Sequence, residues 1–176
     1  RLSETQLREL ERVADETGVS LAMLENLPLW QIAMILQATQ AQRLGLRGDY
    51  GIDYQLLNVA RARHLPVIEL EGADSQIALL RQLPDDGQIL LEDTLTHWHT
   101  NARLLQTMIG WWLDAPPTDS KLTLPSTFSE SLYDVLMNTR NEAWRETLNA
   151  LPAGHYVVAV GALHLYGEGN LPSLLK

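Results

Sequence analysis

The chain of 176 residues contains no cysteine, and only 13 of its residues are lysine or arginine. The lack of cysteine excludes disulfide bonds, thiol catalysis and Cys-ligated zinc or iron–sulfur centres. The 22 acidic residues give a formal net charge of -9, so the average field of the protein repels a nucleic-acid backbone. The longest nearly unbroken apolar run, residues 156–163, is far shorter than the roughly 20 residues of a membrane helix. We therefore expect no nucleic-acid partner and no membrane span in this region.

Apolar residues recur mostly at helical spacing. Ser3 and Gln6 have the spacing of a capping box at the start of the first helix, and Gly18 is placed to end it. The spacing predicts further helices over residues 20–26, 28–44, 54–62, 74–83, 88–112, 129–137 and 140–148. Two segments, residues 66–71 and 156–163, are rich in β-branched residues and predict strands.

Helices that alternate with short β-branched segments predict a helix-rich α/β fold, with a small, mainly parallel sheet covered by about eight helices. Two strands are too few to form such a sheet. We therefore expect residues 1–176 to be the carboxyl-terminal portion of one domain whose amino-terminal segment is absent. The missing strands could also come from a partner chain, through a homo-oligomer or a domain swap. The first residue, Arg1, is not methionine, and a helical pattern follows at once, which favours a piece of a longer protein.

Two polar side chains mark the predicted strand ends. Glu71 closes the first strand and His164 follows the second. If the strands are parallel, both side chains lie at the edge of the sheet where open α/β sheets bind their ligands. A carboxylate beside an imidazole suits either a metal site or an acid/base pair. A catalytic metal usually has three protein ligands, and the only further candidates here are Asp53 and Glu69.

Each of these residues also has a simpler interpretation. His164 could be a turn histidine bonded to backbone, and Glu71 could favour the amino terminus of the next helix through its charge. Asp53 has the position of a cap for a helix that begins at Tyr54. Arg140 opens a helix, where a positive charge is unfavourable, so it is either held by a carboxylate or an anion, or simply solvated.

Four motifs in a fixed order resemble the TraB/GumN family, also called Tiki-like, and its enterobacterial members in particular. They are the Gly51-Ile52-Asp53 turn, the Glu-Leu-Glu71 strand end followed by Gln76, the Arg140-Asn141 pair with Trp144, and the closing VGALHLYGEGNLPSLL. The resemblance runs over essentially the whole chain. It implies a metal-dependent hydrolase, because the animal Tiki proteins are manganese- or cobalt-dependent, membrane-tethered metalloproteases.

The resemblance also implies roles for individual residues. The family has two Gly-x-x-His motifs, and the second maps onto Gly161 and His164, whereas the first is not in this chain. His164 and Glu71 are then the expected metal ligands, with Glu71 as an alternative general base. Arg140 is the second expected catalytic residue, which positions the substrate carbonyl and could stabilise a developing oxyanion or hold a carboxylate. The remaining binding residues implied are Gly161, Gly167, Gly169, Asp53 and Asn141.

Two functions remain open on this basis. The first is a hydrolase that uses Mn²⁺, Co²⁺ or Zn²⁺ in the intact protein and acts on a peptide or small molecule; the present chain, which lacks one motif, is expected to be inactive and to hold no metal firmly. The second is a non-catalytic module with a regulatory role, in which the glycine loop and Arg140 bind an anionic ligand or a peptide. The resemblance to bacterial proteins leaves open whether this protein is located in the cytoplasm or in the periplasm.

Overall fold

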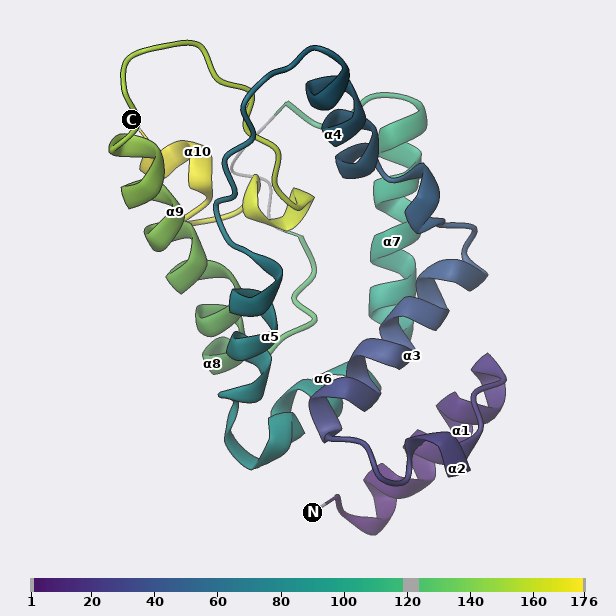
Figure 1. Ribbon diagram of the computed structural model, residues 1–176. Helices are drawn as coiled ribbons and strands as arrows, with labels where there is room; N and C mark the ends of the chain where they lie inside the picture. The colour runs from purple at the N-terminus through teal and green to yellow at the C-terminus, as the bar shows by residue number, and fades with distance from the viewer. Residues whose placement is uncertain (1, 119–123, 176) are drawn as a thin grey trace.

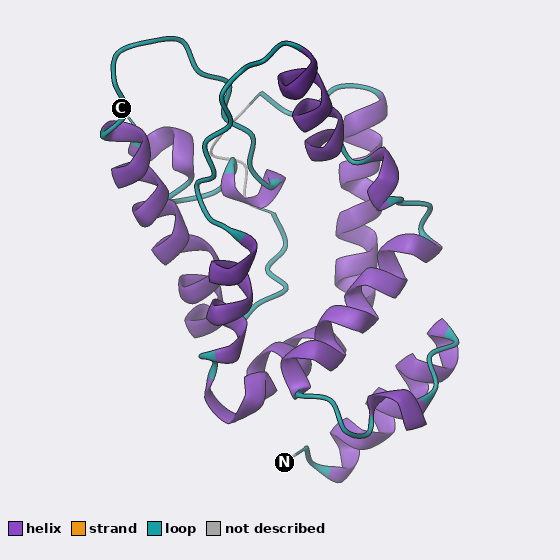
Figure 2. Ribbon diagram, viewed as in Figure 1, coloured by secondary structure: helices purple, strands orange, loops and turns teal. Residues whose placement is uncertain are grey.

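The computed structural model describes residues 2–118 and 124–175, and every regular element within them is a helix (Figure 2). The first part of the chain forms α1 (Glu4–Thr17), α2 (Leu21–Leu24), α3 (Leu29–Arg43), η1 (Gly48–Tyr50), α4 (Ile52–Ala62) and α5 (Ala73–Arg81). The second part forms η2 (Pro84–Gly87), α6 (Gln88–Thr96), α7 (Trp98–Leu113), α8 (Glu130–Tyr133), η3 (Asp134–Asn138), α9 (Thr139–Asn149), η4 (Ala162–His164) and α10 (Leu171–Leu174).

The predicted ends of the first helix are confirmed. The Ser3 hydroxyl accepts a hydrogen bond from the Gln6 amide at 3.2 Å, and the Gln6 side chain accepts one from the Ser3 amide at 2.8 Å. Gly18 ends α1 in the left-handed conformation, with φ of 73°. Local sequence is enough to fix these ends, because all the partners lie within one helical turn.

The core lies where α1, α3 and α6 pack together and α8 meets them. Val13, Leu36, Leu91 and Leu132 represent these four helices and are almost completely buried. The amide of Ser129 also donates to the Asp93 carboxylate at 2.7 Å, which ties the start of α8 to α6. Apolar burial is the main favourable term here, and it links the two halves of the chain.

The predicted sheet is wrong for the part of the chain that the structure describes. Residues 65–69 and 155–160 are irregular, and neither segment pairs with another strand. Val67 is 52% exposed and Val157 is 88% exposed. A preference for strand structure takes effect only where a neighbouring strand bonds to the backbone and a packed face covers the side chains, and the described residues supply neither.

The single long helix predicted over residues 88–112 is also wrong. The helix breaks at His97, which has φ of -103° and ψ of 22° and separates α6 from α7. By contrast, α8, η3 and α9 follow one another without a break, and η3 is a π-helical turn. Such turns are often found at functional sites, and this one directly precedes α9, the helix that carries Arg140.

Figure 1 shows α3 and α7 on one side of the view, and α5, α8, α9 and α10 on the other, with α6 between them below. The short η4 turn lies between these two groups. None of the helices in the described residues is long and apolar enough to cross a membrane, in agreement with the expectation from the sequence.

Gly87 offers a test of the packing between η2 and α3. A Cβ atom added there would lie 2.6 Å from the Trp30 Cβ, and the residue has φ of 80°. Gly18 has a similar φ of 73° but nothing within 4 Å of an added Cβ. We expect Gly18→Ala to lower the free energy of unfolding by about 1 kcal/mol through backbone strain alone. Gly87→Ala should cost roughly 2 kcal/mol more through overpacking. Urea unfolding of both variants measures the difference, and equal losses would contradict the contact with Trp30.

Candidate functional site

Residues from distant parts of the sequence meet beside the first turns of α9. This helix carries Arg140, Asn141 and Trp144. Glu71 comes from the loop before α5, and His164 ends the η4 turn. We call these five residues the polar cluster.

Glu71 and Arg140 form a two-point ion pair. Arg140 Nε donates to Glu71 Oε2 at 3.0 Å, and Nη2 donates to Oε1 at 2.8 Å. The third guanidinium nitrogen, Nη1, donates to the Leu136 carbonyl within the π-helical turn at 3.1 Å. The side chain of Arg140 is only 20% exposed, and that of Glu71 only 13%. A fork-to-fork pair of this kind is strong and directional, and it leaves neither Glu71 oxygen without a cation.

The ion pair explains why the positively charged Arg140 is tolerated in the first turn of α9. Of the interpretations of Arg140, retention by a carboxylate is confirmed, and the carboxylate is Glu71 itself. The sequence offered no direct signal for this choice, because 69 positions separate the two residues and several other acids were available.

Trp144 links the ion pair to the histidine. The Arg140 guanidinium carbon lies 4.9 Å from the centre of the Trp144 ring, a distance at which cation–π attraction acts. The ring centres of Trp144 and His164 are 4.5 Å apart. Trp144 is 6% exposed, so it excludes water from one side of the imidazole.

His164 is buried and uncharged at neutral pH. Its ring is held by Asn141, whose Oδ1 lies 2.7 Å from Nδ1, and Asn141 is buried as well. Burial lowers the pKa of His164 to about 4; the positive charge of Arg140 acts in the same direction, and the charge of Glu71 opposes it. Nδ1 is therefore occupied, and within the described residues Nε2 forms no hydrogen bond.

The three expected glycines differ in their backbone conformations. Gly167 and Gly169 have φ of 82° and 72°, which L side chains rarely adopt, so the closing loop needs glycine at both positions. Gly161 has φ of -57° and needs no such freedom. Its carbonyl accepts the His164 amide at 3.0 Å and closes the η4 turn.

Asp53 does not join the polar cluster. It is exposed in the first turn of α4, and the described residues show no contact between it and Glu71 or His164. The interpretation of Asp53 as a cap is also wrong, because α4 begins at Ile52 and its capping residue is Gly51.

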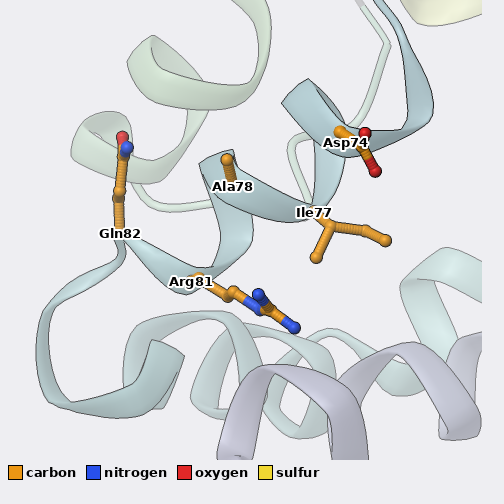
Figure 3. Close-up of a pocket in the computed structure, with 5 residues that line it drawn as sticks. All are labelled: Asp74, Ile77, Ala78, Arg81 and Gln82. Atoms are coloured by element: carbon orange, nitrogen blue, oxygen red, sulfur yellow. The ribbon is translucent and has the colours of Figure 1, made fainter.

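A hollow of about 440 Å³ lies along α5, and none of the residues that line it belongs to the polar cluster. It is lined by Asp74, Ile77, Ala78, Arg81 and Gln82 (Figure 3). Ile77 and Arg81 point to one side of α5, whereas Gln82 points away from them. One helix and its cap supply all of these side chains, so the hollow is an open depression that cannot surround a ligand on several sides as binding pockets do.

Comparison with known proteins extends over the whole chain. The model of the TraB/PrgY/gumN family matches residues 1–176. The chain belongs to this family. It is 66% identical over 176 residues to "Uncharacterized protein YbaP" of Escherichia coli (strain K12), and equally to the protein of that name in Shigella flexneri. The match covers all of this chain and 67% of each relative. No solved structure matches.

The family resemblance implies a divalent metal, but the described residues do not form a site for one. Residues 2–118 and 124–175 contain no group of three histidine, aspartate or glutamate side chains close enough to share an ion. Both oxygens of Glu71 bind Arg140. In the cluster, His164 Nε2 is then the one atom suited and open to bind a metal ion. A catalytic site needs about three protein ligands, so further ligands would have to come from outside the described residues.

Neutral burial of His164 predicts a pH dependence of stability. Its folded pKa of about 4 lies below the unfolded value of about 6.5. The stability that the neutral His164 contributes to the folded state is fully present at pH values above the unfolded pKa. As the pH falls from about 6.5 to 4, the unfolded chain binds the proton first, so the free energy of unfolding should fall by roughly 1 kcal/mol per pH unit. Urea unfolding across this range measures the slope. The His164→Gln variant should lose this part of the slope. If the free energy of unfolding changed with pH in parallel for the variant and the unaltered chain, the burial of a neutral imidazole would be contradicted.

The ion pair predicts a strong asymmetry between single and double variants. Glu71→Leu leaves Arg140 without its partner in a poorly solvated position, and we expect a loss of about 3 kcal/mol in the free energy of unfolding. The double variant Glu71→Leu/Arg140→Met should lose less than this single variant, because no unpaired charge remains. Glu142 and Arg145 form a more exposed pair on the same helix, and Glu142→Leu should change stability by at most about 1 kcal/mol. Equal losses at Glu71 and Glu142 would contradict the importance of burial.

Proposed function

We propose that this chain supplies part of the active centre of a TraB/PrgY/gumN-family hydrolase, with His164 as the side chain that meets the cofactor or the substrate. One observation carries the proposal. His164 is a buried imidazole with Nδ1 held by Asn141, and within the described residues no hydrogen bond is made to Nε2. An imidazole that is held through one nitrogen while the other nitrogen stays open is typical of ligand-binding and catalytic histidines.

The low pKa of His164 favours a ligand role over a role as general base. A general base works best when its pKa is near the working pH, and a value of about 4 makes His164 a weak acceptor of protons at neutral pH. A metal ligand must instead be unprotonated, which this histidine is. The cofactor that we propose is a divalent ion, Mn²⁺, Co²⁺ or Zn²⁺, in a form of the protein that provides the remaining ligands.

Glu71 and Arg140 support the cluster in this proposal and do not act on the substrate. Their ion pair fixes the loop before α5 to the first turn of α9. Arg140 also contacts Trp144, which in turn packs on His164. A direct catalytic role for Glu71 or Arg140 would require the ion pair to open, at a substantial cost for two poorly solvated charges.

The alternative of a non-catalytic module has less support. That hypothesis assigns an anionic ligand to Arg140, but all three nitrogens of the guanidinium already donate to Glu71 or to the Leu136 carbonyl. The positive charge is also offset by Glu71. The alternative predicts stabilisation by a ligand without turnover, so the experiment below distinguishes it.

Metal content and hydrolysis test the proposal together. The 176-residue chain and a form with the full length of the relatives are dialysed against Mn²⁺, Co²⁺ or Zn²⁺ and then assayed with peptides and esters. The longer form should retain about one equivalent of metal and hydrolyse a substrate, whereas the shorter chain should retain less metal and show no turnover. His164→Ala in the longer form should abolish both properties.

His99→Ala is the matched control, because this residue is an exposed histidine on α7. It should leave metal content and turnover unchanged. Equal metal content in the His164→Ala variant would remove His164 as a ligand. A longer form that holds metal through His164 but leaves all substrates intact would favour the binding module.

A further inference from the structure

The amide group of Asn141 lies between a backbone carbonyl and the His164 ring. Its Nδ2 donates to the carbonyl oxygen of Gly169 at 3.1 Å, and its Oδ1 lies 2.7 Å from His164 Nδ1. Asn141 is only 3% exposed, so competing water has little access to either contact.

The carbonyl of Gly169 determines which way this amide faces. A carbonyl oxygen can only accept hydrogen bonds, so the NH₂ end of Asn141 must face Gly169. The oxygen end therefore faces His164, and it too can only accept. It follows that His164 Nδ1 carries the proton in this hydrogen bond. A neutral imidazole has a single N–H, and Nε2 is then left with a free lone pair.

The closing loop holds the Gly169 carbonyl in place. Gly169 has φ of 72°, and the next residue, Asn170, caps α10 by accepting the Ser173 amide at 2.9 Å. The Asn170 side chain also donates to the Gly167 carbonyl at 2.7 Å. The two ends of the loop are thus fixed by hydrogen bonds, and the direction of the Gly169 carbonyl is set by the backbone.

We propose that Asn141 is a positioning residue that, together with the Gly169 carbonyl, holds His164 as the Nδ1–H tautomer and so leaves the Nε2 lone pair available to bind a partner. The tautomer follows from the hydrogen bonds alone. The use of Nε2 as a ligand rests on the function proposed above. Groups that orient the second nitrogen of a ligating histidine commonly affect metal affinity without touching the metal.

Nitrogen-15 NMR of the imidazole tests the tautomer directly in the 176-residue chain. At pH 7, His164 Nδ1 should give a pyrrole-type signal with an attached proton, and Nε2 should give a pyridine-type signal. In Asn141→Leu, which has a similar volume but no acceptor, the two signals should move toward each other because nothing then selects Nδ1. Asn141→Asp keeps an acceptor for Nδ1, so Nδ1 should again give the pyrrole-type signal with an attached proton.

A proton on Nε2 in the unaltered chain would overturn the inference, even if Asn141→Leu fails to fold. An unchanged pattern in a folded Asn141→Leu would overturn it as well. These outcomes are independent of metal and of turnover, so they are distinct from a failure of the proposed function. In the longer form, Asn141→Leu should weaken the binding of Co²⁺ by about tenfold to a hundredfold, and unchanged affinity would remove Asn141 as a positioning residue for that site.

Discussion

The polar cluster depends on the ion pair between Glu71 and Arg140. Two charges that are mostly withdrawn from water are tolerated only when they neutralise each other with good geometry, and this pair does so through two hydrogen bonds. The constraint also positions its neighbours. It holds the loop before α5 against α9 and keeps the guanidinium beside Trp144, whose other neighbour is the His164 ring. The ion pair, the tryptophan and the histidine therefore form one packed unit.

The electrostatics of this unit give Glu71 and His164 different roles. Glu71 and Arg140 offset each other, and the remaining influence on His164 is dominated by burial, with the charge of Arg140 acting in the same direction. The result is a carboxylate that is already bound and an imidazole that is neutral. The first is poorly suited to hold another cation, because both of its oxygens bind Arg140, whereas the second retains a nitrogen that can bind one partner. The residues that the structure describes therefore supply one open imidazole nitrogen and no group of three side chains that could share a metal ion.

The sequence singled out residues that the structure brings together, whereas the chemical roles expected of them remain predictions. It identified Glu71, Arg140, Asn141 and His164, and all four lie in the polar cluster. It placed Glu71 and His164 at the edge of a sheet, however, and the described residues form none. The two side chains are instead connected through other residues: Glu71 binds Arg140, Arg140 contacts Trp144, and Trp144 packs on His164. Asp53, which had the right residue type and a plausible spacing, is exposed on α4 and lies outside the polar cluster.

What the sequence determined by itself is local. The capping box at Ser3, the left-handed glycine after α1 and the helical spacing of apolar residues all depend on partners within about one or two turns, so short-range rules suffice to predict them. The tertiary structure decided whether the β-branched segments became strands, where the helix of residues 88–112 broke, and which acid paired with Arg140. Each of these outcomes depends on groups far apart in the sequence, since a strand needs a neighbour and a buried charge needs an opposite charge. No local pattern contains that information.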